Sequence, residues 1–510
     1  MFSKILSGSL YGLNAGIVAV EADLSGGLPA FQVVGLPDAS VRESKERIRA
    51  AIRNAGFVFP TKKITINLSP ANTRKEGTQF DLPIAAGILS ASGQLNIGSR
   101  FESFACLGEL SLDGRVKSIK GALPLVIGLR NAGVTDMILP SGNISEASIV
   151  DHVRLYPVTD LSEVAGIISG SEKREPCIAH SAAACAPSGE AADFGDVAGQ
   201  ESVKRALQIA AAAFHNILMI GSPGSGKTMM ANRLPSILPP LSYDEKLEIT
   251  QIYSIAGELT DRMPVIDWRQ FRSPHHSISR SALVGGGMGP KPGEISLAHH
   301  GVLFLDELPE FDRRVLEALR QPMENERVSI SRSAGVVSYP SKFLFAASMN
   351  PCPCGYYGDG LHECTCTASQ ISNYMAKISG PLMDRIDIHI EVPTPGFSEL
   401  CGASGQKSSA DMREDVARAL DIQHERYINE EITYNSQLTP ALIRKYCVLD
   451  METRKLLEGA FTRLKLSARA YTKIIRLSRT IADLEGEEDI RVEHVAEAIG
   501  YRSLDRRFKA

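Results

Sequence analysis

A short glycine-rich segment in the middle of the chain constrains the fold more than any other feature. The apolar run 217–220 is followed by Gly221, Ser222, Pro223, Gly224, Ser225, Gly226, Lys227 and Thr228. This order matches the G-x-x-x-x-G-K-[ST] phosphate loop, in which backbone N–H groups surround phosphates, the lysine contacts the β- and γ-phosphates and the threonine holds Mg²⁺. The motif needs a buried strand before it and a helix after it. The sequence therefore predicts a nucleotide-binding α/β sheet.

Two later apolar segments supply the other parts of such a site. Residues 302–305 are apolar and end in Asp306 and Glu307, and residues 343–349 end at Asn350. Ligands of open α/β sheets lie at the carboxyl ends of the strands. We therefore expect Asp306 to orient the hydrated Mg²⁺ and Glu307 to polarise the attacking water. Asn350 is expected to position that water beside the γ-phosphate, because phosphoryl transfer depends on positioning more than on covalent chemistry.

Length and composition indicate a large cytoplasmic protein. The 510 residues, 44% of them hydrophobic and 22% charged, are enough for two or three domains with their own cores. No apolar run approaches the roughly 18 to 20 residues of a membrane span, and residues 1–5 are not followed by the apolar core of a signal peptide. Nine cysteines, an odd number, suit a reducing compartment. A net charge of −4 means that any nucleic-acid contact must be local.

The first part of the chain is expected to form a separate α+β domain. Val41, Ile48 and Ile52 share one face of an expected amphipathic helix over 41–52. Residues 169–190 lack periodicity and are rich in small residues, so we interpret them as a linker. Strand-like segments occur at 15–22, 30–35, 63–68, 104–110 and 136–139.

Several strings in this domain resemble the proteolytic domain of the Lon protease. They are Asn67–Pro70 with Lys75–Leu82, and Gly108–Gly121 with Met137–Pro140. The resemblance places Gln79 where Lon has its nucleophilic serine, and Leu123 near the position of its partner lysine. A Ser/Lys pair needs a hydroxyl within reach of an amine, and an amide cannot act as the nucleophile. We interpret the domain as a scaffold or oligomerisation element; an unconventional protease is the alternative.

Downstream strings resemble the AAA+ family. Asp193–Gln200 resembles the start of its ATPase core, and Gly380–His389 resembles the stretch whose arginine reaches a neighbouring subunit. The resemblance implies that Arg385 offers a planar fork of donors to the γ-phosphate bound by that neighbour. The alternative is an ordinary ion pair with Asp384 or Asp387.

The chain becomes helical from about residue 408. Ser467–Gly486 resembles the second-sensor helix of the magnesium-chelatase branch, which implies that Arg469 is a nucleotide sensor. Arg476 and Arg479 lie on the same helix, so a solvated surface charge is the alternative for any one of the three. Apolar spacings of three and four residues predict helices over 409–427, 440–447, 451–464, 468–484 and 491–500.

Two closely spaced cysteine pairs follow Asn350. Four thiolates suit tetrahedral Zn²⁺, which would make a rigid clip on the preceding strand. The spacing is C-x-C and not the usual C-x-x-C, so reduced thiols that pack a loop and a redox pair remain alternatives, with His362 as an alternative ligand. The four residues are Cys352, Cys354, Cys364 and Cys366.

Two insertions in the ATPase core, residues 271–300 and 326–340, look like pore loops. The second alternates around residues 333–335 and predicts a β-hairpin. Arg280, Lys291 and Arg332 are expected to hold DNA phosphates without reading bases. The alternative is that these insertions only pack subunits together.

Over essentially the whole chain these motifs resemble the ComM/YifB family of magnesium-chelatase-like AAA+ proteins. The strings that carry the resemblance are Gly35–Arg47, Asn67–Asn72, Pro274–Ser279 and Asn350–Gly355. It implies an α/β and α+β multidomain fold with a Lon-protease-like domain, a P-loop AAA+ αβα core and a helical lid. The expected divisions are residues 1–168 for the Lon-like domain, 169–190 for the linker, 191–400 for the core and 401–510 for the lid.

The resemblance also implies a function. It indicates a bacterial homo-hexameric ring that uses ATP and Mg²⁺ to drive branch migration of single-stranded or branched DNA, notably during natural transformation, without a membrane. A magnesium-chelatase-type motor that remodels a protein partner in tetrapyrrole synthesis is the alternative, and the fused Lon-like domain argues against it. An ATP-dependent protease is a third possible function, and Gln79 in place of a nucleophilic serine argues against it.

Overall fold

The protein is described by a computed structural model in which two compact units are distinguished. One unit comprises Met1–Cys185 together with Tyr243–Asp267, and the other comprises Ala186–Ser242 together with Trp268–Ala510. Sequence analysis places Tyr243–Asp267 inside the 191–400 core, because local periodicity carries no signal of which unit a helix packs against. The described residues are 1–98, 102–178, 192–260, 262–287, 290–332, 335–394, 396, 407–464 and 466–502.

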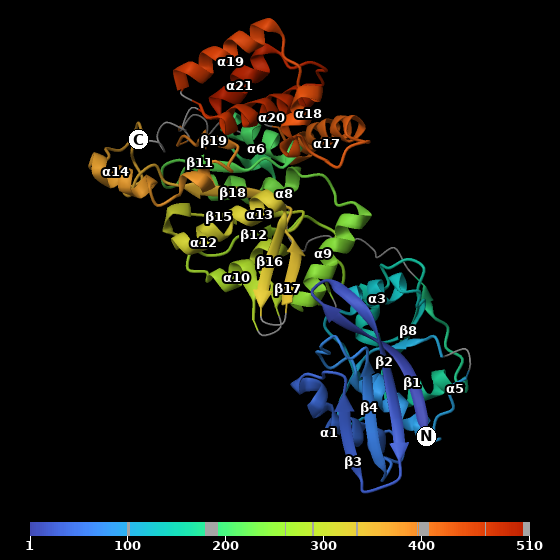
Figure 1. Ribbon diagram of the computed structural model, residues 1–510. Coiled ribbons are helices and arrows are strands. Elements are labelled where there is room, and N and C mark those ends of the chain that lie inside the picture. Colours follow the sequence, from blue (N-terminus) through green and yellow to red (C-terminus); the bar gives the residue numbers. More distant parts are fainter. Residues whose placement is uncertain are drawn as a thin grey trace. The chain divides into compact units, whose positions relative to one another are not determined.

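An eight-stranded mixed sheet organises the first unit, in the order β10-β9-β8-β5-β1-β2-β4-β3. Figure 1 labels β1, β2, β3, β4 and β8 of this sheet. Strands lie at all five segments that the sequence predicts, although 104–110 contains two short strands. β1, β7, β9 and β10 were not predicted. β6 and β7 pair with each other in a separate two-stranded sheet. The bounds are β1 Phe2–Tyr11, β2 Asn14–Ser25, β3 Ala30–Val34, β4 Lys63–Ser69, β5 Ala105–Cys106, β6 Glu109–Leu110, β7 Val116–Lys117, β8 Asp136–Pro140, β9 Arg154–Val158 and β10 Cys177–Ile178.

Helix α9 (Tyr243–Ala256) completes this unit by packing on α3 (Ala122–Asn131). The Ser254 hydroxyl donates to Glu146 Oε2 over 2.6 Å, and the Tyr243 hydroxyl donates to the Ile149 carbonyl over 2.7 Å. Glu146 is buried, so this hydrogen bond satisfies a group that would otherwise be costly to bury. The other helices of the unit are α1 Ala39–Asn54, α2 Asp81–Ala91, α4 Ile144–Ala147 and α5 Leu161–Ser169.

A five-stranded parallel sheet organises the second unit, in the order β12-β15-β18-β11-β19. Every residue of β11, β15 and β18 is buried, as expected for strands covered on both faces. The predicted parallel α/β sheet is confirmed. The bounds are β11 Ile217–Ile220, β12 Phe271–Arg272, β15 Val302–Leu305, β18 Leu344–Met349 and β19 Ile388–Glu391.

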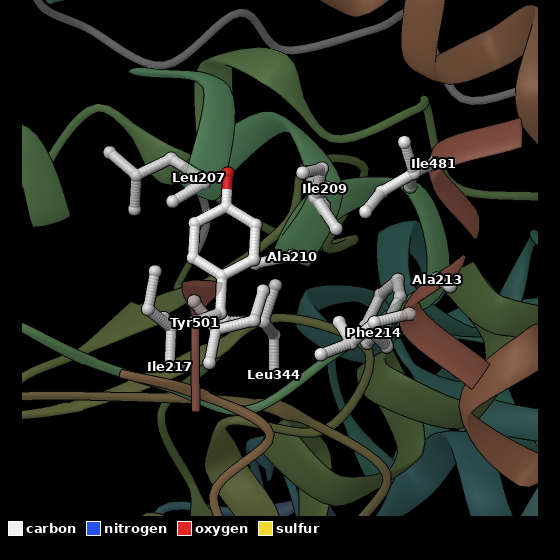
Figure 2. Packing of buried hydrophobic residues seen from close by; sticks show 14 of the residues in the cluster. Leu207, Ile209, Ala210, Ala213, Phe214, Ile217, Leu344, Ile481 and Tyr501 are labelled. Carbon is white, nitrogen blue, oxygen red and sulfur yellow. The ribbon is translucent and has the colours of Figure 1, made fainter. Parts of the chain in front are cut away.

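The helices that follow the sheet share a hydrophobic core with it. Figure 2 shows Leu207 and Ala210 of α6 (Glu201–Ala213) near Ile217, Leu344 and Tyr501, within one buried cluster. All five C-terminal helices appear within two residues of their predicted bounds: α17 Ser409–Arg426, α18 Pro440–Tyr446, α19 Met451–Leu464, α20 Ala468–Leu484 and α21 Val492–Gly500. Within the described ranges, no helix is long and apolar enough to cross a membrane.

Candidate nucleotide-binding site

The phosphate-loop motif lies at the carboxyl end of β11, in the context that its chemistry requires. Gly224 and Gly226 adopt φ of 79° and 88°, which side chains disfavour, and α7 (Lys227–Ala231) begins directly after them. A Cβ on Gly221 would lie 2.4 Å from the Val392 carbonyl oxygen, so only glycine fits there. Backbone N–H groups in such a turn can surround phosphate oxygens.

Lys227 is folded over this loop. Its Nζ donates to the carbonyl oxygens of Gly221 and Ser222 over 2.7 and 2.8 Å, and lies 3.4 Å from Asn350 Oδ1. Burial lowers the pKa of Lys227, and the carboxylates of Asp306 and Glu307 oppose that shift. The ammonium thus lies beside the loop, with Asn350 from the neighbouring strand next to it.

Asp306 is held from three directions at the end of β15. Its Oδ2 accepts a 2.6 Å hydrogen bond from the Thr228 hydroxyl, and its Oδ1 accepts bonds from the Glu307 backbone N–H and the Ser348 hydroxyl. Ser348 is fully buried on β18, and sequence reasoning missed it. The sequence feature that could have indicated Ser348 is that it is a hydroxyl residue in an otherwise apolar strand, two residues before Asn350. This arrangement brings together the two residues expected to hold hydrated Mg²⁺.

Glu307 leaves its strand in a left-handed conformation, with φ of 53°, and its side chain is 58% exposed. Both Glu307 and Asn350 line a cavity of about 450 Å³. His276 lies beside this carboxylate, with its Nδ1 3.8 Å from Glu307 Oε2. His276 is a second residue that sequence reasoning did not assign to the site. Other lining residues are Glu310, Pro353, Gln370, Asn373, Tyr374 and Lys377.

Arg385 and Arg469 lie elsewhere, at the opposite edge of the same sheet. They line a cavity of about 610 Å³ together with Asn216 and Phe343, the residues that precede β11 and β18. The phosphate loop follows β11, and four parallel-strand residues span roughly 13 Å. The structure therefore brings the two arginines together and separates both from the phosphate loop of their own chain.

Each of these arginines pairs with a carboxylate in the cavity wall. Arg385 Nη2 donates to Glu324 Oε2 over 2.5 Å, and Arg469 Nη1 donates to Asp384 Oδ2 over 3.0 Å. The alternative partners expected for Arg385 were Asp384 and Asp387, and it pairs with neither. Glu324 is 64% exposed and the Arg469 side chain is 71% exposed. The Arg385 side chain is 17% exposed and Asp384 is 34% exposed, so each pair joins one exposed group to one partly buried group, and solvent screens the attraction at the exposed partner.

A buried ion pair fixes the helix that carries Arg469. Lys473, one turn further along α20, donates to the Ile386 carbonyl over 2.8 Å and lies 3.0 Å from Asp387 Oδ1. Burial opposes ionisation of Asp387, but Lys473 and His215 outweigh it and lower the pKa of that carboxyl. The pair joins α20 to the start of β19, two residues after Arg385.

The other two arginines of α20 have structural partners. Arg476 donates to the Leu438 carbonyl, and Arg479 is 2% exposed and paired with Asp483. Arg469 is therefore the most exposed of the three candidates and shares its cavity with Arg385 and Arg476.

The comparisons with known proteins agree with this geometry. Over 508 residues the chain is 42% identical to the competence protein ComM of Haemophilus influenzae, with 98% of this chain and 97% of that protein covered. It is 43% identical over 498 residues to YifB of Salmonella typhimurium, with 97% and 96% covered. The chain belongs to the ComM/YifB family of magnesium-chelatase-like proteins.

Three family models match most of the same length. Subunit ChlI of Mg-chelatase matches residues 20–143, magnesium chelatase subunit ChlI matches 193–400, and its C-terminal model matches 406–502. The magnesium-chelatase subunit ChlI of Nephroselmis olivacea is 21% identical over 332 residues, 60% of this chain and 86% of that protein. Together with the site, the ComM/YifB family supports an AAA+ ATPase that uses ATP and Mg²⁺.

The side chains of the four cysteines that follow Asn350 lie together in one cluster. Their sulfurs all lie within 4.8 Å of one another, and Cys352 Sγ is 3.3 Å from Cys354 Sγ and 3.7 Å from Cys364 Sγ. A hydrogen bond from the Tyr356 backbone N–H, with others from neighbouring thiols, lowers the pKa of Cys354 to about 6. The fourth member is Cys366.

This cysteine loop touches the phosphate loop. A Cβ on Gly355 would lie 2.7 Å from the Pro223 ring, so the two loops are in close contact. His362, the alternative ligand, instead bonds Asp359 over 2.8 Å and is not in the group of four sulfurs. A rigid cysteine loop would therefore support the phosphate loop directly.

The two insertions form one structure. The predicted hairpin is observed as β16 (Arg327–Arg332) and β17 (Gly335–Pro340), and its Tyr339 hydroxyl donates to the Pro290 carbonyl of the first insertion over 2.6 Å. Arg280, the first residue of α10 (Arg280–Val284), is exposed, as is Lys291 of β14 (Lys291–Pro292). The Arg332 side chain lies outside the described part of the chain.

The two positions that the sequence resemblance matches to the Lon dyad carry an amide and an aliphatic side chain. Gln79 is 6% exposed and its Nε2 donates to the Glu76 carbonyl over 2.8 Å. Leu123 is fully buried in α3. Neither side chain can perform the chemistry of a serine or a lysine.

Proposed function

We propose that this protein is an ATP-driven motor that moves single-stranded or branched DNA as a ring-shaped homo-hexamer. The observation that carries the proposal is the placement of Arg385 and Arg469 at the sheet edge opposite to the phosphate loop. A site whose cationic groups lie on the far side of the same subunit is completed by a second copy. Repetition of one such head-to-tail contact gives a ring when the rotation between neighbouring copies closes, and we propose that it closes at six.

Each ATP site would then be shared by two subunits. Lys227 and the loop backbone would hold the phosphates, Thr228 and Asp306 would hold Mg²⁺, and bound Mg²⁺ would neutralise charge on the phosphates. Glu307 would take a proton from water and Asn350 would orient it. Arg385 and Arg469 of a neighbour would stabilise the charge of the transition state once they leave Glu324 and Asp384.

The remaining parts are assigned to the same machine. The first unit would be a Lon-like scaffold without protease chemistry, and α17–α21 would form the lid. The insertion that carries Arg280 and Lys291 and the hairpin that carries Arg332 would contact DNA phosphates. These contacts carry no base information, as a motor that moves along any sequence requires.

The cysteine loop is proposed to hold structural Zn²⁺. Four sulfur donors within one ligand sphere fit the tetrahedral preference of that ion, which supplies cross-linking and no redox chemistry. Its contact with Pro223 would make the metal a support for the phosphate loop. A redox pair or free packing thiols are the alternatives that metal analysis separates.

ATP hydrolysis with and without DNA tests the motor. The full chain is assayed alone, with single-stranded DNA, with duplex and with a four-way junction. We expect the junction or the single strand to stimulate hydrolysis, and the junction to be unwound. The name of the ComM relative refers to competence, and DNA integration during natural transformation is the process that this activity would serve.

Two rivals predict other results. A chelatase-type motor that remodels a protein partner would hydrolyse ATP at the same rate with every DNA. The 21% identity to a chelatase subunit, over 60% of this chain, supports that reading. A protease would cleave unfolded casein with ATP, and the buried amide of Gln79 opposes this.

A further inference from the structure

We propose that the free edge of β3 is a docking surface for a second copy of this chain. The two β3 strands would lie antiparallel about a two-fold axis at Gln32, the middle residue of the strand. The contact joins the first units of two chains. It goes beyond the proposed ring, because it uses a surface of the first unit that the ATP site does not involve.

One side of β3 is open to another strand. Among the residues that the structure describes, β3 is the last strand of the eight-stranded sheet and is hydrogen-bonded to β4 alone. The pairing is parallel and matches Gln32 with Thr65. In a strand with one neighbour, alternate residues direct their backbone N–H and C=O groups away from that neighbour. These groups are a template for pairing with another chain.

This edge lacks the charges that usually keep edge strands apart. Residues 24–37 contain no Asp, Glu, Lys or Arg, although 22% of the whole chain is charged. Proteins commonly protect an edge strand with charged side chains or with proline. Here Pro29 and Pro37 flank the strand. Proline has no N–H to donate, so the two prolines limit pairing to about the five residues of β3 and favour one discrete contact.

Two exposed leucines lie symmetrically about the strand. Leu28 is 89% exposed and Leu36 is 56% exposed, and each is four positions from Gln32. Leu36 has a φ of 57°, which is uncommon for residues other than glycine. Its carbonyl accepts a 3.1 Å hydrogen bond from the N–H of Lys75, whose side chain is fully buried. The loop after β3 thus holds an apolar side chain in solvent at one end of the strand, and Leu28 does so at the other end.

Antiparallel pairing about Gln32 makes these features self-complementary. The two-fold axis places Leu28 of each copy opposite Leu36 of the other. It also places Phe31 opposite Val33, an aromatic and β-branched pair of the kind that stabilises antiparallel strands. Phe31 and Val33 are half-buried against the core of the first unit, and the second copy would cover them further. A two-fold contact needs this property, because the same patch of surface is used by both chains.

Neighbouring registers lose this match. An axis at Phe31 would set Pro29 opposite Val33 inside the ladder, and an axis at Val33 would set Leu28 opposite Asp38. A peptide of unrelated sequence would need none of this symmetry, so the symmetry favours a second copy as the partner. Two paired strands are marginally stable in water, so one contact is weak. Several contacts between two rings would reinforce one another.

Charge at the two-fold axis tests the contact. Gln32 is exposed and would lie opposite its own copy, so Gln32→Lys and Gln32→Glu each place two like charges opposite each other. Sedimentation of the full chain, with and without a non-hydrolysed ATP analogue, gives the number of chains per particle. We expect each variant alone to have about half the number of the natural sequence, because a two-fold contact doubles whatever assembles without it. The two variants, assembled separately and then mixed, should recover the natural number.

Two further variants separate the contact from a defect in folding. Leu28→Ser changes a side chain that is almost fully exposed, so the urea midpoint should be unchanged while the fraction of doubled particles falls. Asn14→Lys is the matched control for added charge, since Asn14 is exposed on β2, which has a neighbour on each side. Its number of chains should equal that of the natural sequence.

The outcomes keep this inference distinct from the proposed ring. Halving in either condition, with recovery on mixing, supports the β3 contact. Equal numbers for the natural sequence and both Gln32 variants in both conditions, or no recovery on mixing, overturns it. A variant that falls from rings to single chains would place β3 in the ring contact and also overturns the two-fold axis. If the natural sequence never forms particles with a multiple of six chains, the ring proposal fails, whereas a change from two chains to one still decides the β3 contact.

Discussion

The Thr228 hydroxyl donates a 2.6 Å hydrogen bond to Asp306 Oδ2 across 78 positions of sequence. Thr228 lies beyond the carboxyl end of β11 and Asp306 beyond that of β15, and β18 lies between these two parallel strands in the sheet. Their contact brings together the two side chains that we propose hold hydrated Mg²⁺. The surrounding side chains are expected to act at different steps, ATP binding or ATP hydrolysis, and substitutions can distinguish these roles.

Lys227→Ala and Glu307→Gln should fail at different steps. Lys227 makes a ground-state charge contact, so its loss should abolish ATP binding. Glu307 acts when water is activated, so Glu307→Gln should bind ATP normally and hydrolyse it about 10²- to 10⁴-fold more slowly. Binding of a fluorescent ATP analogue and single-turnover hydrolysis measure the two effects. Wild-type turnover in Glu307→Gln would show that this carboxylate is not the base.

Arg385→Ala should bind ATP but lose about 10³-fold or more in turnover, since its target phosphate belongs to another subunit. Mixing it with Lys227→Ala protein should restore some hydrolysis, because one interface can then combine an intact loop with an intact arginine. Mixed rings are verified by differently tagged chains. Verified mixed rings without any recovery would contradict action between subunits.

Zinc content tests the cysteine loop. Elemental analysis of the purified full chain should find about one zinc per chain, and Cys352→Ser with Cys354→Ser should lose it. Because Gly355 packs on Pro223, the double variant should also bind ATP more weakly. A Cys447→Ser variant is the matched control, as that buried thiol lies on another element. Absence of zinc from protein purified without chelator would rule out the metal.

The salt dependence of DNA binding tests the insertions. Each phosphate contact releases counterions, so Arg280→Ala, Lys291→Ala or Arg332→Ala should weaken binding and reduce the slope of log K against log salt by about one unit. Assembly and DNA-free hydrolysis should be preserved. Arg418→Ala, at an exposed position of α17, is the control. If all three variants retain natural affinity and slope, DNA contacts lie elsewhere.

The first unit should show an acid-sensitive ion pair. Two hydrogen bonds from Arg174, with the backbone N–H of Thr159, lower the pKa of Glu163 to about 2. A carboxyl with a depressed folded pKa stabilises the fold above its unfolded pKa of about 4.3 and loses that effect as pH falls toward 2. Glu163→Gln should therefore lower the urea midpoint of this unit at pH 7, and the difference should shrink below about pH 4. A difference independent of pH would contradict this.

Much of the nucleotide site could be predicted because its signals are local. The phosphate loop, Asp306 and Asn350 each follow an apolar strand, and parallel strands bring their carboxyl ends to one edge. Ser348 and His276 were missed because their roles depend on which strands are neighbours. β12 has only two residues, Phe271 and Arg272, so it is too short to show the alternation of hydrophobic and polar residues that predicts a strand.

The strand β1 was missed for a different reason. Its buried positions include Ser3 and Ser7, so the alternation of burial is not an alternation of hydrophobicity. The Ser3 hydroxyl donates to the Gly87 carbonyl over 2.7 Å, which satisfies a polar group inside the unit. Small polar residues that contact a neighbouring backbone carry no signal in a single sequence.

Because Tyr243–Asp267 belongs to the first unit, cleavage of a single peptide bond cannot separate the two units. The chain crosses between them after Cys185, after Ser242 and after Asp267. A protease that cleaves within 179–191 would give a nicked chain whose fragments stay joined, because α9 remains packed on α3. Each unit is encoded by two separate stretches of the gene, so neither unit can be exchanged or expressed as one continuous segment. The two units are therefore joined by three covalent connections and not by one.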